Sequence, residues 1–211
     1  MSERVLQVDA LARVEGEGAL YVRLNGEEIE KVEFRIFEPP RFFEAFLQGR
    51  DGHEAPDITS RICGICPIAY IMGASQAVEQ ALGVAVTPEI HRLRRLIYCG
   101  EWIQSHVLHA AMLHAPDFLG LHDAIKIAEV DPDLVKTALR LKKIGNSLME
   151  VVGGRSVHPI NTRVGGFYSA PDKAKVKALL PELEWGIRAA RDVAVAFSKF
   201  DFPDDEHDYT F

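Results

Sequence analysis

Two cysteines separated by two residues, Cys63 and Cys66, are the side chains of this 211-residue sequence best suited to chemistry. A Cys-x-x-Cys turn can bring both sulfurs to one side, where they can bind one metal ion. Gly64 permits the tight backbone that this convergence needs, and Pro67 suits the first turn of a helix that leaves the loop. Two thiolates do not complete an ordinary metal site, so further ligands have to come from elsewhere.

Spacing alone leaves three alternatives open for this pair. A zinc site needs four ligands, and no second Cys-x-x-Cys or His-x-x-Cys follows in the sequence. A thioredoxin-like redox pair would follow a strand in a βαβ unit, and the helix-rich sequence around the pair shows no such alternation. The third alternative is a coincidence of two buried cysteines.

Three other side chains on one expected helix have plain structural interpretations. Cys99 lies in the middle of an apolar helix, so we expect a core residue rather than a third ligand. His106 and His109 lie three residues apart and could share a face with a metal ion. No carboxylate or thiol stands at matching spacing, so we expect histidines of the core or the helix surface.

His158 is more suggestive, because it precedes Pro159 in a glycine-flanked loop and loops on a rigid scaffold often carry function. Glu15 and Glu44 would pass as surface acids on composition alone. In a buried site with thiolates, such a carboxylate could relay protons or hold a hard cation.

The composition is that of an ordinary globular protein, with 47% hydrophobic and 26% charged residues. The 24 basic and 31 acidic residues give a net charge of −7, which predicts no binding to nucleic acid or to an anionic membrane. No apolar run approaches the length of a membrane span, and the first residues lack an apolar signal core. Three cysteines argue against a secreted disulfide scaffold, so we expect free thiols in a reducing cytoplasm.

The first forty residues predict strands that would precede the cysteine loop. Apolar and polar residues alternate over 20–25 and 32–37, and Asn25-Gly26 between them favours a tight hairpin turn. A short helix is expected over 41–47, with its phenylalanines on the buried side. A loop over 49–59 would then deliver the chain to Cys63.

The remainder of the sequence predicts helices. Residues 67–82 are apolar on nearly all sides, which indicates a helix buried within the core and ended by Gly83. Further helices are expected from Pro88 to about His114, from Pro132 to the glycines at 153–154, and from 169 onward with a break at Pro181. The predicted fold class is α+β, a small N-terminal antiparallel sheet followed by a bundle of long helices. We expect one domain over 1–211, with 1–40 mainly β and 41–211 mainly α.

The sequence Arg61-Ile62-Cys63-Gly64-Ile65-Cys66 closely resembles the first cysteine motif of the large subunit of nickel-iron hydrogenases. Residues 13–16 resemble the family's N-terminal Arg-x-Glu-Gly motif, and 41–44 resemble its acidic helix before the cysteines. Segments 104–117 and 153–166 are also similar, so the ordered matches span nearly the whole chain. The motifs are closer to the cytoplasmic, NAD(P)-linked or sulfur-reducing branch than to the periplasmic uptake enzymes.

The resemblance implies a role for each candidate residue. Cys63 would be a terminal nickel ligand, and Cys66 would bridge nickel to an iron that carries cyanide and carbon monoxide. Glu15 would be the first proton relay, Glu44 would ligate a nearby magnesium ion, and His158 would approach an iron-sulfur cluster of the small subunit. The implied reaction is the reversible splitting of dihydrogen into protons and electrons.

Two departures from the family pattern matter. Tyr70 stands where many members carry a histidine, and a phenol does not exchange a proton near neutral pH as imidazole does. The family's second cysteine pair has no counterpart before Phe211, and neither has the histidine that completes the magnesium site. The chain therefore resembles the N-terminal half of a large subunit, which supplies two of four thiolates.

The resemblance also implies partners. These are the iron-sulfur small subunit, diaphorase-type NAD(P)-binding subunits and a C-terminal half with the second cysteine pair, all in the cytoplasm. One alternative is a non-catalytic subunit on the same scaffold, although such relatives have lost the cysteines. The other is a small zinc or thiol module that uses Cys63 and Cys66 alone.

Overall fold

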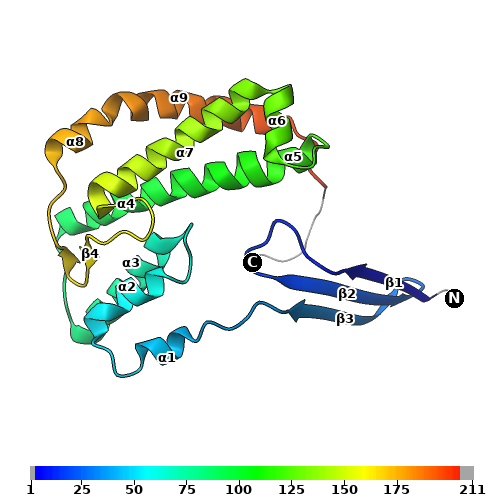
Figure 1. The fold of residues 1–211 in the computed structure, drawn as a ribbon, viewed down its shortest axis with the longest axis horizontal. Coiled ribbons are helices and arrows are strands. Elements are labelled where there is room, and N and C mark those ends of the chain that lie inside the picture. The colour runs from blue at the N-terminus through cyan, green and yellow to red at the C-terminus, as the bar shows by residue number, and fades with distance from the viewer. Residues whose placement is uncertain (1–2, 205–211) are drawn as a thin grey trace. The chain divides into compact units, whose positions relative to one another are not determined.

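The computed structural model describes residues 3–204, which belong to two compact units that divide between Phe42 and Phe43 (Figure 1). The first unit carries a three-stranded sheet, and the second is built mainly of helices. This confirms the α+β fold class that the sequence predicts. That both units belong to one domain stays a prediction.

The N-terminal sheet is antiparallel, with strand order β1-β2-β3. Its strands are β1 (Glu3–Val8), β2 (Gly18–Asn25) and β3 (Glu28–Ile36). Val22 lies opposite Val32 and Leu20 lies opposite Phe34, so the alternating apolar residues of the two strands share a face. Gly26 takes a φ of 65° in the turn, which confirms the expected hairpin.

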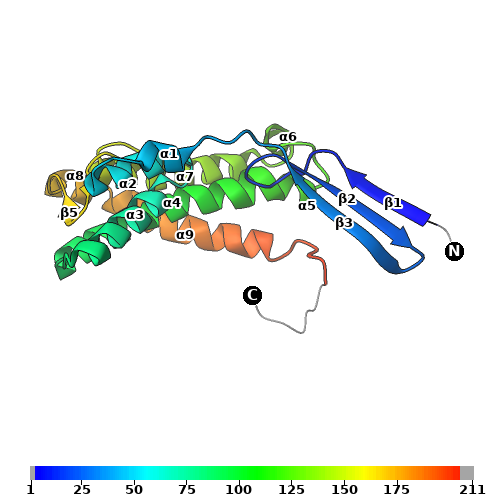
Figure 2. The ribbon, with the colours of Figure 1, turned by 90° about the horizontal axis from the view of Figure 1, so that it is seen from below.

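The helical unit begins with α1 and ends with α9, and a short two-stranded hairpin interrupts it. Its elements are α1 (Phe43–Leu47), η1 (Gly52–Glu54), α2 (Ala55–Ser60), α3 (Pro67–Leu82), α4 (Pro88–Val107), the π-helical η2 (Leu108–His114), α5 (Ala115–Phe118), α6 (Ala124–Val130), α7 (Pro132–Gly153), β4 (Thr162–Arg163), β5 (Gly166–Phe167), α8 (Lys173–Ala178) and α9 (Leu180–Phe197). The long helices α4 and α7 run side by side, and α9 lies along α7 (Figures 1 and 2). Among the described residues, no helix combines the length and apolar character that crossing a lipid bilayer requires.

The helix ends follow the signals in the sequence. The side chains of Thr87, Asp131 and Asp172 accept hydrogen bonds from backbone N–H groups in the first turns of α4, α7 and α8. Gly83 and Gly154 end α3 and α7 in the left-handed conformation, with φ of 67° and 87°. These boundaries agree with the prediction, as does the break before Pro181.

Two glycines set the distance between α4 and α7. A Cβ on Gly145 would lie 2.5 Å from the carbonyl oxygen of Gly100, and a Cβ on Gly100 would lie 2.9 Å from the carbonyl oxygen of Gly145. Only the absence of both side chains lets the two backbones approach this closely. Next to this contact lies the apolar core, made of Ile68, Ile71, Met72, Ile97, Met149 and Val152.

Three local expectations are wrong. The phenylalanines near α1 do not form a buried side: Phe46 is 56% exposed although its ring contacts that of the half-buried Phe43, and the five-residue α1 contains no buried residue. The segment 49–59 is not a loop, because Asp51 and Glu54 form a capping box that starts η1 and leads into α2. Helix α3 is buried on one face only, because Ile68, Ile71 and Met72 are buried whereas Tyr70 on the opposite side is 37% exposed.

Candidate functional site

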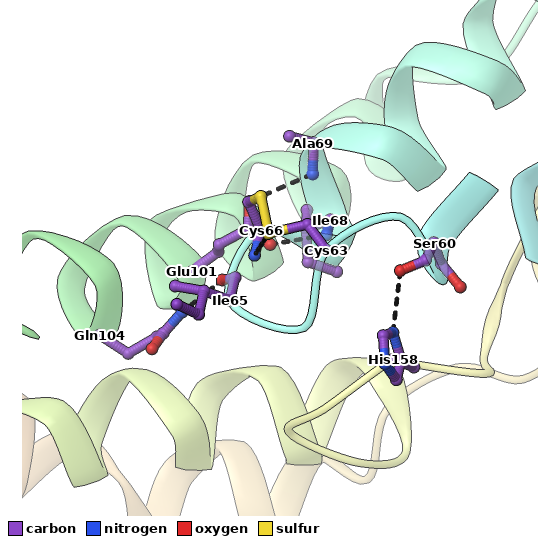
Figure 3. The surroundings of a disulfide bond; sticks show 9 residues. All are labelled: Ser60, Cys63, Ile65, Cys66, Ile68, Ala69, Glu101, Gln104 and His158. Atoms are coloured by element: carbon purple, nitrogen blue, oxygen red, sulfur yellow. Dashed lines mark hydrogen bonds between the residues drawn. A yellow bond between two sulfur atoms is a disulfide. The ribbon is translucent and has the colours of Figure 1, made fainter. Parts of the chain in front are cut away.

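The loop over 61–66 joins α2 to α3 and places both cysteines at the start of α3 (Figure 3). The Cα atoms of Cys63 and Cys66 lie 5.4 Å apart, and the backbone N–H of Cys66 donates to the Sγ of Cys63 at 3.1 Å. The expected convergence of the two sulfurs is therefore confirmed. The expectation of free thiols is not, since the two sulfurs form a disulfide. The convergence that would let both sulfurs bind one metal ion also lets them bond to each other.

Two side chains of α4 form hydrogen bonds with the backbone at the end of this loop and in the first turn of α3 (Figure 3). The amide nitrogen of Gln104 donates to the carbonyl oxygen of Ile65 at 2.7 Å. The carboxylate of Glu101 accepts from the backbone N–H groups of Ile68 at 2.6 Å and Ala69 at 3.1 Å. The main chain is thus anchored on both sides of Cys66.

Glu101 is the functional candidate that sequence reasoning missed. Its side chain is only 2% exposed, and removal from water raises the pKa of this carboxyl to about 7, although the two backbone hydrogen bonds act in the opposite direction. A signal was present in the sequence. Glu101 and Gln104 follow Ile97 by four and seven residues, so all three share the buried face of α4.

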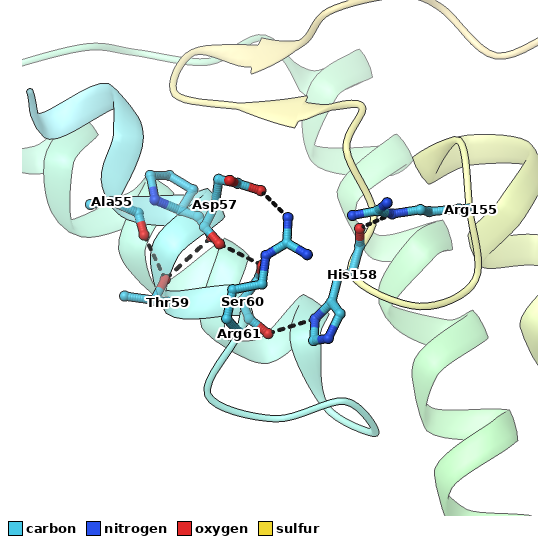
Figure 4. A network of polar contacts seen from close by, with 8 residues as sticks. Ala55, Asp57, Thr59, Ser60, Arg61, Arg155 and His158 are labelled. Atoms are coloured by element: carbon cyan, nitrogen blue, oxygen red, sulfur yellow. Dashed lines mark hydrogen bonds and ion pairs between the residues drawn. The ribbon is translucent and has the colours of Figure 1, made fainter. Parts of the chain in front are cut away.

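His158 is brought to the end of α2, just before the cysteine loop (Figure 4). Its Nδ1 lies 2.9 Å from the carbonyl oxygen of Ser60, so the ring donates this hydrogen bond from Nδ1. The residue adopts a φ of 47°, which is uncommon for a residue with a Cβ. The Nε of Arg155 donates to the carbonyl oxygen of His158 at 2.6 Å and holds this conformation.

The same corner of the structure is tied together by short-range contacts (Figure 4). A nitrogen of the Arg61 guanidinium lies 2.9 Å from a carboxylate oxygen of Asp57, one turn earlier on α2. The hydroxyls of Thr59 and Ser60 donate to backbone carbonyls of the same helix. The arginine before the cysteine pair is therefore held by α2, close to the residue that His158 contacts.

The two predicted carboxylates, Glu15 and Glu44, are both exposed. Glu44 is in the first turn of α1, a helix that lies against α2. Glu15 belongs to the other unit, in the loop that joins β1 to β2. Over residues 3–204, no group of three or more His, Cys, Asp or Glu side chains is placed to hold a metal ion.

The remaining candidates behave as structural residues. His106 and His109 are exposed on α4 and η2, as expected for histidines of a helix surface. Cys99 is half-buried and carries a free thiol. Among the described residues, the two sulfurs at the start of α3 are the best suited to bind a soft transition metal, once the disulfide is reduced to two thiolates.

Comparisons with known proteins identify relatives of the chain. The nickel-dependent hydrogenase family matches residues 41–137. Subunit alpha of sulfhydrogenase 2 from Pyrococcus furiosus is 37% identical over 194 residues, which are 92% of this chain and 47% of that protein. Subunit alpha of sulfhydrogenase 1 from the same organism is 34% identical over 196 residues, with 93% and 46% covered. The crystal structure of an NAD+-reducing NiFe hydrogenase in the H2-reduced state matches with a TM-score of 0.80 and 30% identity, over 93% of this chain and 46% of that one.

The chain spans about half the length of the curated relatives it matches. The similarity extends over both units, since more than nine-tenths of the 211 residues are covered.

Proposed function

Because the chain belongs to the nickel-dependent hydrogenase family, whose large subunits it matches over their N-terminal half, we propose that it supplies half of a hydrogenase active site. The proposed reaction is the reversible oxidation of dihydrogen to protons and electrons. The observation that carries the proposal is the convergence of Cys63 and Cys66 on a loop whose main chain α4 anchors on both sides of Cys66.

The donor set fits a soft transition metal. In the reduced protein, Cys63 would be a terminal ligand of nickel, and Cys66 would bridge nickel to an iron that carries cyanide and carbon monoxide. Such a centre, when bound, supplies the site at which dihydrogen is split. Thiolates suit it because they tolerate changes in the redox state of nickel. Two further thiolates are required, and we propose that a C-terminal half with the second cysteine pair provides them.

The other predicted side chains would transfer protons, bind magnesium and contact the electron-accepting partner. Glu15 would take up a proton from the site, since a carboxylate is a suitable general base. Glu44 would ligate magnesium, which prefers oxygen donors. His158 donates from Nδ1 to the carbonyl of Ser60, so its Nε2 is left to face an iron-sulfur cluster of a partner. Electrons would leave by that route.

The proposed partners follow from the relatives. We propose an iron-sulfur small subunit as the electron acceptor and diaphorase-type NAD(P)-binding subunits beyond it, in the cytoplasm. The sulfhydrogenase alpha subunits and the NAD+-reducing enzyme support a branch of this kind. Nucleic acid has no place in this function, in keeping with the net charge of −7.

The test is metal content together with hydrogen-dependent dye reduction, measured on the chain co-produced with the C-terminal half and the small subunit. We expect nickel and iron in the wild type, loss of nickel and activity in Cys63→Ser and Cys66→Ser, and retention of both in Cys99→Ser. An assembled complex with activity unaffected by replacing both cysteines would instead indicate a non-catalytic subunit on the same scaffold. One equivalent of zinc bound by the chain alone, and lost in Cys63→Ser, would indicate the zinc module.

A further inference from the structure

We infer that Glu101 and Gln104 are positioning residues for the cysteine pair, because together they fix the main chain on both sides of Cys66. The inference rests on the proposed function, since a shared metal site needs two sulfurs at one fixed separation. Within residues 3–204, the two side chains hydrogen-bond to backbone atoms of the loop and of α3 and not to the sulfurs. Both act through the backbone.

The two side chains form hydrogen bonds with the backbone before and after Cys66. Gln104 donates to the carbonyl oxygen of the residue before it at 2.7 Å. Glu101 accepts from the N–H groups of Ile68 and Ala69, two and three residues after it, at 2.6 and 3.1 Å. Both come from successive turns of one helix, so the spacing of the anchors is set by α4 rather than by the loop (Figure 3).

Glu101 also accepts the hydrogen bonds that the N-cap side chain of a helix usually accepts. Cys66 is the N-cap of α3, and within residues 3–204 its side chain makes no capping hydrogen bond. At most helix starts a Ser, Thr, Asp or Asn side chain accepts from the first free N–H groups. Here the carboxylate of a second helix accepts from them, 32 and 33 residues away in sequence. The sulfur of Cys66 is thereby left available for bonding elsewhere.

The anchors are themselves held firmly. The ammonium group of Lys142 on α7 donates to the side-chain oxygen of Gln104 at 3.0 Å, which orients its amide nitrogen toward the loop. A Cβ on Gly145 would lie 2.6 Å from the backbone nitrogen of Gln104, so α7 presses directly against this turn of α4. Glu101 is 2% exposed and Gln104 is 4% exposed, so water does not compete for either set of hydrogen bonds.

The inference is tested by the equilibrium between the Cys63–Cys66 dithiol and its disulfide in a glutathione buffer. Disulfide formation consumes one oxidised glutathione and releases two reduced ones, and alkylation followed by mass spectrometry measures the ratio. The chain carries Cys99→Ser so that two thiols remain. The variants are Glu101→Gln, which places an amide NH2 group where an acceptor is needed, and Gln104→Leu, which removes the donor to Ile65. Glu89→Gln is the control, since Glu89 lies on the same α4 but is exposed and pairs with Arg92 instead of contacting the loop.

We expect the equilibrium constant for disulfide formation to fall at least tenfold in both variants, about 30 mV for this two-electron couple, because a relaxed loop holds the sulfurs together less of the time. The control should stay within about twofold of the parent. Variants that match the parent, or a control that shifts as much as they do, would overturn the inference. If circular dichroism shows that Glu101→Gln does not fold, the disulfide equilibrium of Gln104→Leu alone decides the test. The measurement uses no metal and no partner, so its failure and that of the proposed function are separate results.

Discussion

Arg94 of α4 and Glu79 of α3 form a buried ion pair, with Nη1 of the arginine 2.8 Å from a carboxylate oxygen. Their side chains are 5% and 7% exposed. The N–H of Gly165 donates to the same carboxylate at 2.7 Å, and Arg94 also donates to the carbonyl of Arg163 at 3.3 Å. The pair therefore joins α3, whose N-cap is Cys66, to α4 and to the β4–β5 hairpin.

Breaking this pair from one side should destabilise the protein strongly. Arg94→Met leaves a buried carboxylate with one remaining partner, so we expect the free energy of unfolding to fall by about 3–5 kcal/mol. The double variant Glu79→Met with Arg94→Met should lose less than the sum of the single variants, because no unpaired charge remains. Urea unfolding at neutral pH checks this. Additive losses would show that the two side chains are not coupled.

The glycines between α4 and α7 give a second prediction. Gly145→Ala would place a methyl group 2.5 Å from the carbonyl oxygen of Gly100, so the helices must separate, and we expect a loss of about 1–3 kcal/mol. Gly73→Ala is the matched control, because among the described residues nothing lies within 4 Å of its added Cβ in the middle of α3. The control should gain about 0.5–1 kcal/mol from helix propensity. Thermal unfolding of both variants measures the difference, and equal effects would contradict the close contact.

The stability should depend on pH through Glu101. Burial raises the pKa of its carboxyl to about 7 in the folded protein, above its usual value of 4.5. The folded state then binds the proton more tightly than the unfolded state. The stabilisation is fully present below about pH 4.5 and is lost as the pH rises through about 7, by at most about 3 kcal/mol.

Glu101→Gln removes this titration. In urea unfolding measured from pH 5 to pH 8, the wild type should lose stability and the variant should change much less. Glu79 contributes with the opposite sign at lower pH, because hydrogen bonding to Arg94 holds the pKa of its carboxyl below the usual value. The stabilisation from ionised Glu79 is present above the pKa of this carboxyl in the unfolded chain. It is lost as the pH falls through the lower pKa of the folded state. An equally steep loss above pH 5 in Glu101→Gln would assign the effect to another group.

His158 gives a prediction based on backbone conformation. Its φ of 47° is tolerated by Asn but strained for a β-branched residue. His158→Asn should lose about 1 kcal/mol, for the hydrogen bond to Ser60. His158→Val should lose about 1–3 kcal/mol more, because strain is added to the loss of the bond. Denaturant unfolding of the two variants decides, and equal losses would show that the left-handed backbone is not the cause.

Local signals in the sequence were sufficient for much of the fold. The hairpin at Asn25-Gly26, the caps at Thr87 and Asp131, and the stop at Gly154 each act within a few residues, so they can be recognised without tertiary information. The capping box of Asp51 was equally local. The segment is also rich in Gly, Asp and Pro, and this composition predicts a loop, which is why the capping signal is easily missed.

The candidate site was only partly predictable. The convergence of Cys63 and Cys66 follows from their spacing. The role of Glu101 depends on the crossing of α3 and α4, which brings residues 33 apart in sequence within 2.6 Å, and no local pattern contains that distance. The exposure of Phe46 has the same origin, because periodicity indicates an apolar face but does not say whether anything covers it.

The most direct test of the central claim is X-ray absorption at the nickel edge of the assembled complex. We expect sulfur ligands on nickel in the wild type and fewer sulfur ligands in any nickel retained by Cys63→Ser, with Cys99→Ser unchanged. A nickel spectrum that is identical in the wild type, Cys63→Ser and Cys66→Ser would contradict the claim that these two thiolates bind the metal.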